Sequence, residues 1–436
     1  MTLWTETFIR SLVTDAGSLR DGQAIGTPAR WQSFGRTDRA AWGLARGSAK
    51  EPYKTAIDLS DGASKCSCPS RKFPCKHAVG LMFLLAADAV PQAQYAPPAW
   101  VTTWIDGREK REQPKPAAPP KPVDAAAQAK RQRAREAKVE AGLDELRRWL
   151  EDLARGGLSD PRVKRYPYWD GIAARMVDAQ MSPLAIRLRR MGGRPFQRSD
   201  DWMQVVAEEI GMLYALTDAY TRLDSLPEPL QADVRAALGF TLKAEDVAAV
   251  GTLVRDLWHV MGIVTEDEDR LIIRRTWLYG EQSGGYALIL DFAPKHQSFT
   301  TGYPLGATLD ADLIFYPSAY PQRALVRQIY AASASLPISA PFATIDRFLD
   351  VYADALAHNP FLDRIPAGVA PAWLNTQRLE DANGRWVAAR NPPAAPWLLA
   401  VTGGQPIPIL GEWDGLEFRP LTLLTDEGWV SVGSDL

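Results

Sequence analysis

Residues 66–77 of this chain have the sequence Cys66-Ser67-Cys68-Pro69-Ser70-Arg71-Lys72-Phe73-Pro74-Cys75-Lys76-His77. The segment holds all three cysteines of the 436 residues and one of the four histidines, in the spacing C-x-C, six residues, C-x-H. Three thiolates and one imidazole form the Cys3His set that fills a tetrahedral zinc site, whereas cysteines used only for packing would be scattered along the chain. The sequence therefore predicts one structural Zn²⁺, bound by Cys66, Cys68, Cys75 and His77.

The spacing of the four ligands suits a single ion. Side chains two positions apart on an extended strand point to the same face, so Cys66 and Cys68 can bind the metal from one side. Cys75 and His77 stand where a helix is expected to begin, which would aim both at the same ion. A disulfide would leave one cysteine over, and buried free thiols would leave the histidine unexplained. Another thiophilic metal stays an alternative to zinc.

The segments on either side of the ligands predict a small ββα unit. Apolar and polar residues alternate over residues 42–46 and 53–59, and a turn at Gly47-Ser48 joins the two runs. This pattern indicates a hairpin that leads into Cys66. Residues 78–88 are apolar on nearly all sides, which indicates a helix that the hairpin or the N-terminal segment covers.

The pattern C-x-C-x(n)-C-x-H, preceded by a strand and followed by an apolar helix, resembles the SWIM zinc finger. Upstream, Ala29-Arg30-Trp31, Gly35-Arg36 and Ala41-Trp42-Gly43 resemble the N-terminal region of bacterial SWIM proteins of about this size. The resemblance covers residues 1–105 and implies a zinc-stabilised module that binds DNA or protein; it does not imply an enzyme. Bacterial SWIM proteins of this type are often associated with MoxR-like ATPases and von Willebrand A-domain proteins. The resemblance therefore also implies, as the alternative to nucleic-acid binding, an adaptor that partners such proteins.

Length and composition predict several domains of the α+β class. The 46% of apolar residues and 9% of aromatic residues are enough for well-buried cores. We expect a SWIM zinc-finger domain at residues 1–105 with its core motif at 53–90, and a linker rich in Pro, Ala and Lys at 106–138. A helical region is expected at 139–262 and a β-rich α+β domain at 263–436.

The periodicity of apolar residues supports these divisions. The basic run 130–138 is predicted to be an exposed segment at the start of a helix that continues through Leu153. Helical spacing over residues 246–261 predicts a further helix, and short apolar runs from residue 271 onward predict strands. A helix is expected at 344–357, followed by short strands at 373–388 and 397–432.

Charge is unevenly distributed along the chain. Residues 1–138 carry 22 Lys and Arg against 13 Asp and Glu, a net charge of +9, whereas residues 139–436 carry 28 against 39, a net charge of −11. Lys65, Arg71, Lys72 and Lys76 surround the ligands and are candidate contacts to nucleic-acid phosphates or to a protein partner. The alternative is that they compensate the anionic zinc cluster and keep the loop solvated.

Signals of catalysis and of membrane insertion are weak. Neither G-x-x-x-x-G-K-[ST] nor G-x-G-x-x-G occurs in the sequence. His259 is expected to pack within a helix, and the acidic cluster 266–269 to form an exposed turn. The chain has no signal-peptide pattern at its start and no apolar run long enough to cross a bilayer. We therefore expect a non-catalytic, cytoplasmic protein without contact to a membrane.

Overall fold

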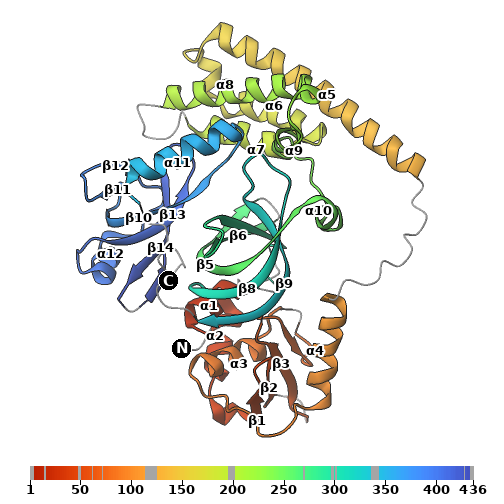
Figure 1. Ribbon diagram of the computed structural model, residues 1–436, viewed down its shortest axis with the longest axis vertical. Coiled ribbons are helices and arrows are strands. Elements are labelled where there is room, and N and C mark those ends of the chain that lie inside the picture. Colours follow the sequence, from red (N-terminus) through yellow and green to blue (C-terminus); the bar gives the residue numbers. More distant parts are fainter. Residues whose placement is uncertain are drawn as a thin grey trace.

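The computed structural model describes residues 4–13, 16–47, 51–60, 62–70, 72–112, 125–194, 202–268, 271–295, 299, 302–334, 343–426 and 428–432. Figure 1 shows the zinc-ligand unit at one end, a helical bundle at the other, a β-barrel between them and a second sheet beside the barrel. The predicted α+β class, with a helical middle region and a β-rich C-terminal region, is confirmed.

The N-terminal unit is built on a four-stranded antiparallel sheet in the described part of the chain, where the sequence predicted only a hairpin. Its strands are β1 (Trp31–Arg36), β2 (Ala40–Ala45), β3 (Tyr53–Asp58) and β4 (Ser64–Cys66). The helices α1 (Glu6–Leu12), α2 (Ala16–Ile25) and α3 (Lys76–Ala86) cover one face of the sheet, and α4 (Ala99–Glu112) covers the other. Ala56 and Ile57, neighbours on β3, are both fully buried and belong to the two opposite cores, as the alternation of side chains on a strand requires.

Residues 106–112, predicted as the start of a linker, belong to α4. Val101 and Ile105 of α4 pack against Trp42, and Nε of Arg108 donates to Oδ2 of the buried Asp58 over 3.0 Å. These contacts explain why the helix extends past the predicted boundary at residue 105. The Pro-rich part of the predicted linker, 113–124, lies outside the described residues.

The middle of the chain forms a helical bundle, as predicted. Its helices are α5 (Ala125–Gly156), α6 (Tyr166–Asp178), α7 (Ser182–Gly193), α8 (Trp202–Thr221) and α9 (Glu228–Ala237). Trp169 is fully buried in the core, and its Nε1 donates to the carbonyl of Val163 over 2.8 Å. The basic run 130–138 lies at the start of α5, where Arg135 is held against the ring of Phe240 at 4.4 Å.

The chain then forms a closed five-stranded barrel. Its strands are β5 (Thr252–Glu268), β6 (Leu271–Gly280), β7 (Tyr286–Pro294), β8 (Ala307–Phe315) and β9 (Arg323–Ala334), and the short helix α10 (Ala244–Val250) precedes them. The order around the barrel is β5-β6-β7-β9-β8, and β7 and β9 run parallel. With a parallel pair formed by its third and fifth strands, this is the connectivity of an OB-type Greek-key barrel.

The predicted helix over 246–261 is wrong from Thr252 onward, because these residues form the first half of β5. Residues 258–262 of this strand are buried. Gly262 packs against Leu421 of the neighbouring sheet, so the strand is covered on its outer face as well. A strand that is buried on both faces carries a continuous apolar run, which by periodicity resembles a buried helix. The predicted domain boundary at residue 262 consequently falls inside a strand.

The C-terminal unit contains a six-stranded sheet within the residues described, ordered β12-β11-β10-β13-β14-β15. The strands are β10 (Ile365–Leu374), β11 (Arg378–Asp381), β12 (Trp386–Ala388), β13 (Ile407–Trp413), β14 (Phe418–Thr425) and β15 (Gly428–Ser431). Helix α11 (Ile345–His358) packs on one face through Phe348, whose ring lies 5.6 Å from that of Trp413. Residues 397–402, part of the range 397–432 that was predicted as short strands, belong instead to the helix α12 (Ala395–Thr402).

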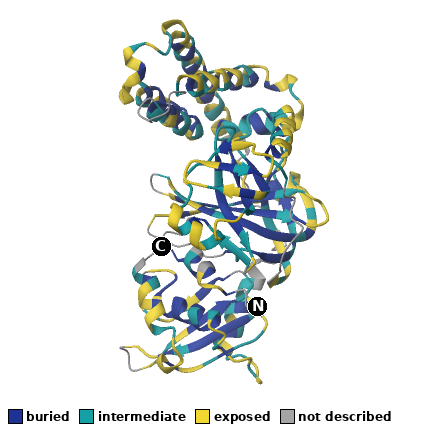
Figure 2. Ribbon diagram, turned by 90° about the vertical axis from the view of Figure 1, so that its left-hand side faces the viewer, coloured by how far each residue is buried: buried dark blue, intermediate teal, exposed yellow. Residues whose placement is uncertain are grey.

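Direct contacts join the units. Leu421 of β14 packs with Trp277 and Leu288 of the barrel, and the buried strands of this region are dark in Figure 2. At the other end, a Cβ added to Gly302 would come within 2.5 Å of Cδ2 of Leu12, so α1 of the zinc-ligand unit touches the barrel. No helix in the described ranges is both long enough and apolar enough to span a membrane.

Candidate metal centre

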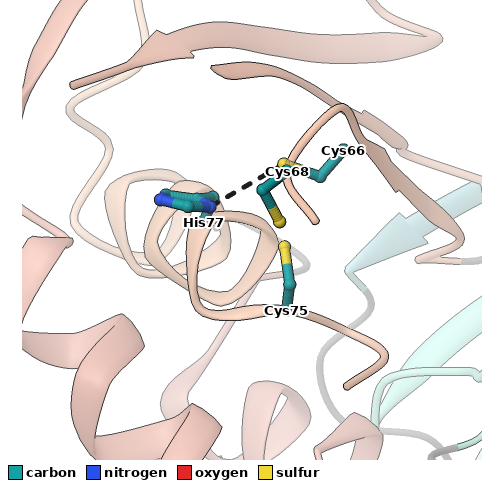
Figure 3. A group of neighbouring side chains, drawn as sticks. All are labelled: Cys66, Cys68, Cys75 and His77. Carbon is teal, nitrogen blue, oxygen red and sulfur yellow. Dashed lines mark hydrogen bonds between the residues drawn. The ribbon is translucent and has the colours of Figure 1, made fainter. Parts of the chain in front are cut away.

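The four predicted ligands converge on one point (Figure 3). Cys66 is the last residue of β4, Cys68 follows it by two positions, Cys75 is the N-cap of α3, and His77 lies in the first turn of that helix. Their ligand atoms all lie within 4.8 Å of one another, and Sγ of Cys66 is 3.8 Å from Nδ1 of His77. Sulfur atoms bound to one tetrahedral zinc are about 3.8 Å apart, given a Zn–S distance of about 2.3 Å. The donor set and its spacing therefore fit one Zn²⁺, and the prediction of a Cys3His zinc site is confirmed.

Neighbouring side chains hold the ligands in place. Oγ1 of Thr55, which pairs with Cys66 across β3 and β4, lies 3.2 Å from the Cys66 sulfur. The ring of Tyr53 lies against that of His77, with 4.8 Å between the centroids. His77 is 4% exposed, so its ring cannot turn away from the sulfurs without disturbing the core. Partners of this kind fix the orientation of metal ligands before the metal binds.

The pKa values of the three thiols are shifted in different directions, and burial raises the pKa of Cys68. Hydrogen bonds from Cys75, His77 and Thr55 outweigh burial and lower the pKa of Cys66 to about 4. The hydrogen bond to Cys66, together with burial, raises the pKa of Cys75. A bound Zn²⁺ would hold all three cysteines as thiolates, because coordinating thiols are deprotonated.

All four positions of a tetrahedral ion are filled by protein ligands. A catalytic zinc keeps one position open for water or substrate, whereas a structural zinc does not. Across the part of the chain that the structure describes, no other group of His, Cys, Asp and Glu side chains is close enough to hold a metal. The arrangement is thus suited to stabilising the fold of β3, β4 and α3.

The four predicted contact residues do not share one surface. Lys72 and Lys76 are exposed and line a hollow of about 640 Å³ beside the ligands. Lys65 is also exposed, but it pairs with Ala56 on the side of the sheet that α4 covers, opposite to Cys66. Arg71 lies outside the described residues.

Two further cations, which the sequence did not indicate as contacts, also line the hollow. Arg30 ends the 3-10 helix η1 (Pro28–Arg30), and Arg46 follows the end of β2. Both are far from the ligand motif in sequence. The pairing of β1 with β2 brings Arg30 beside Arg46, and the pairing of β2 with β3 and of β3 with β4 brings both towards the ligands. The other residues that line the hollow come from α2, the segment after β2, the start of β3, the ligand loop and α3: Ser18, Asp21, Ile25, Gly47, Tyr53, Cys68, Pro69, Ser70 and His77.

Two other sequence candidates have structural roles. His259 is a buried residue of β5, and its ring nitrogens lie 2.8 Å from Oγ1 of Thr308 and 3.0 Å from Oε2 of Glu281. Glu266, expected in an exposed turn, is a strand residue that is paired with Arg275 over 2.6 Å and also with Arg419. Because Glu266 is neutralised by these ion pairs with arginine, it is not available to bind a cation.

The face on which OB-type barrels bind nucleic acid is partly covered in this structure. That face is formed by the second and third strands, here β6 and β7. Trp277 of β6 and Leu288 of β7 are both buried against Leu421 of the C-terminal sheet. The hollow beside the zinc ligands is consequently the better candidate for a binding surface.

Two segments of the chain match the models of known protein families. Residues 53–86 match the model of the SWIM zinc finger, and this range covers β3, β4 and α3 with all four ligands. Residues 134–238 match the model of the SWIM-associated four-helix bundle domain, which covers the bundle from within α5 to the end of α9. Comparisons with curated proteins and with solved structures found no match.

Proposed function

We propose that the SWIM zinc finger of this chain, followed by its SWIM-associated four-helix bundle, is a non-catalytic module that binds DNA or a protein partner. One observation carries the proposal: the protein supplies all four ligands of a tetrahedral zinc, and the loop that holds them borders an exposed hollow lined by cations. The metal fixes the loop, and the loop and its neighbours present the binding surface. Zinc supplies on the order of 10–16 kcal/mol to the folding of small zinc-finger peptides, so binding should depend on the metal.

DNA is the first candidate for the ligand. The cationic residues of the hollow and the net charge of +9 over residues 1–138 favour a polyanion. A reducing, cytoplasmic location is part of this proposal, because it keeps thiolates available for the metal.

An adaptor role is the second candidate, and a specific surface favours it. Trp373 of β10 and Trp386 of β12 are 43% and 55% exposed, and both stand opposite Glu380 of the intervening strand β11. Exposed tryptophans are enriched at protein interfaces. In this role the chain would bind a MoxR-like ATPase or a von Willebrand A-domain protein, with no activity of its own.

The proposal is tested by affinity capture of the tagged full chain from lysate, with and without a strong zinc chelator. We expect one class of ligand, nucleic acid or a specific protein, to be retained and then lost on chelation. The Cys68→Ser variant should behave like the chelated protein. Retention of the same ligands by the metal-free protein would contradict the proposal.

A further inference from the structure

The hollow beside the zinc ligands combines cations from three separate segments. Arg30 comes from η1, Arg46 from the end of β2, and Lys72 and Lys76 from the ligand loop and the start of α3. Asp21 is the only acidic side chain among the residues that line it in the described structure. A hollow of about 640 Å³ has the size of a small-molecule site and is wide enough for a nucleotide-sized group.

The two arginines are fixed side by side by the backbone. The N–H of Arg46 donates to the carbonyl of Arg30 over 2.9 Å. Nε1 of Trp31 donates to the carbonyl of Ile25 over 2.9 Å and so fastens η1 to the end of α2. Both arginines therefore sit on firm backbone, while their side chains extend into solvent.

Three of these cations lack a protein partner. Within the residues that the structure describes, the side chains of Arg30, Arg46 and Lys76 form no hydrogen bond or ion pair. Cations that served only to balance local charge would be expected to lie against carboxylates. Here Asp21 provides one negative charge, and three thiolates with one Zn²⁺ provide another. Four cations against these two charges leave a net charge of +2 at the hollow.

The aromatic side chains of the hollow are not available for stacking on a base. The ring of Tyr53 lies against that of His77, and the backbone of Gly47 lies so close to the Tyr53 ring that an added Cβ there would collide with it. His77 is itself a metal ligand and 4% exposed. Recognition of bases by stacking requires a free aromatic face. The hollow therefore offers cations for phosphate groups but no free aromatic face on which a base could stack.

We propose that this hollow binds the phosphodiester backbone of a nucleic acid, with Arg30 and Arg46 contacting phosphates, and that binding is independent of base sequence. The proposal rests on the proposed function, because it names the ligand of the same zinc module. It extends the binding surface beyond the zinc finger itself, since Arg30 and Arg46 precede residues 53–86.

The test compares the full chain with a double variant in the hollow and a control variant on the other side of the sheet. Arg30→Gln with Arg46→Gln removes two cations from the hollow, whereas Lys65→Gln removes one cation from the opposite side of the same sheet. Binding to fluorescent DNA duplexes of two unrelated sequences is measured over a series of KCl concentrations. Zinc content and the thermal unfolding midpoint are measured for every variant.

We expect the double variant to bind both duplexes more weakly and to the same degree. Its slope of log affinity against log salt should be smaller by about 2, which corresponds to the loss of two phosphate contacts. Its zinc content and unfolding midpoint should stay at wild-type values. The Lys65→Gln variant should retain the wild-type affinity and slope.

Three results would overturn the proposal. One is an unchanged salt slope in the double variant, which would place any DNA contact elsewhere. Another is a preference of more than tenfold for one duplex that the double variant abolishes, because it would show readout of bases. The third is the absence of DNA binding by a wild-type chain that captures a protein in a zinc-dependent manner. That third result would leave the proposed binding module standing, whereas loss of zinc-dependent capture of any ligand would remove both.

Discussion

Arg275 of β6 and Glu412 of β13 form a buried ion pair that joins the barrel to the C-terminal sheet. Nε of Arg275 lies 2.7 Å from Oε1 of Glu412, Nη2 lies 3.0 Å from Oε2, and the two side chains are 7% and 2% exposed. Glu412 also accepts hydrogen bonds from Nε1 of Trp277 at 2.8 Å and from Nη1 of Arg364 at 3.2 Å. A carboxylate with this many donors fixes the relative position of the two units, because any displacement would leave charge buried without a partner.

Replacement of Glu412 by Ala should lower the free energy of unfolding by about 3–5 kcal/mol, since it leaves the buried Arg275 without its main partner. The matched control is Glu380→Ala, which breaks the exposed pair with Arg378. That change should cost about 0–1 kcal/mol. Urea unfolding followed by tryptophan fluorescence measures both, since Trp277 lies beside the pair. An equal decrease in the free energy of unfolding in the two variants would show that the buried ion pair contributes no more to stability than the exposed one.

Acidification should weaken the same interface. Burial would raise the pKa of Glu266, but the hydrogen bond and charge of Arg275, with the charges of Arg419 and Arg364, lower it from 4.5 to about 2. The pKa of Glu412 is also lowered, because Arg275, Arg364 and Trp277 outweigh its burial. Depressed carboxyl pKa values stabilise the fold above pH 4.5, and this contribution disappears as the pH falls from 4.5 towards 2.

We therefore expect the unfolding midpoint in urea to decrease steeply below pH 4.5. In the Glu412→Ala variant the decrease should be shallower, because one of the two titrating groups is absent. The measurement is urea unfolding at a series of pH values between 2 and 7. A midpoint that does not depend on pH over this interval would contradict the assignment.

Removal of one zinc ligand should unfold the zinc module. Cys68→Ser keeps the shape of the side chain but replaces a thiolate by a poor zinc ligand, so the zinc content should fall well below one ion per chain. Ser67→Ala, at the adjacent exposed position, should retain the full metal content. Atomic emission analysis of protein purified under reducing conditions measures the metal. Stoichiometric zinc in Cys68→Ser would disprove the ligand assignment.

The close crossing of α2 and α3 should tolerate no side chain at Gly22. A Cβ at this position would lie 2.5 Å from Cβ of Val79, which is buried in α3. Gly22→Ala should therefore destabilise the unit by about 1–3 kcal/mol through overpacking.

The matched control for Gly22 is Gly107 of α4, where an added Cβ would meet no atom within 4 Å. Gly107→Ala should leave stability unchanged or raise it by about 0.5–1 kcal/mol, as for an unobstructed glycine within a helix. Hydrogen exchange of the α2 and α3 amides distinguishes the two variants. Faster exchange in Gly107→Ala than in Gly22→Ala would contradict the packing argument.

The metal site could be predicted almost completely, whereas the contact surface could not. The four ligands lie within twelve residues, so their convergence needs only one strand end, one short loop and one helix start. The role of Lys65 depends on which face of β4 it occupies, and the sequence reasoning placed it with the ligands. The contribution of Arg30 and Arg46 depends on the pairing of β1 with β2, a contact that the predicted hairpin lacked.

The β-rich region shows the same division. Short apolar runs from residue 271 onward indicated most of the strands, because side chains alternate or are uniformly apolar there, but residues 397–402 form a helix. The segment from Thr252 to Met261 was assigned to a helix, because its apolar spacing fits both structures and local propensity does not separate them. The segment forms a strand because it pairs with both β6 and β8, and this pairing closes the barrel.

By itself, the sequence determined that this protein holds one Cys3His zinc site, and that helices precede a β-rich region. Both follow from interactions between residues that are near neighbours in the chain. Only the tertiary structure decided that strand β5 closes a barrel, that Arg275 meets Glu412, and that four cations from distant segments surround one hollow. Such contacts join residues far apart in sequence, and their geometry is set by how the sheets and helices pack, which no local pattern encodes.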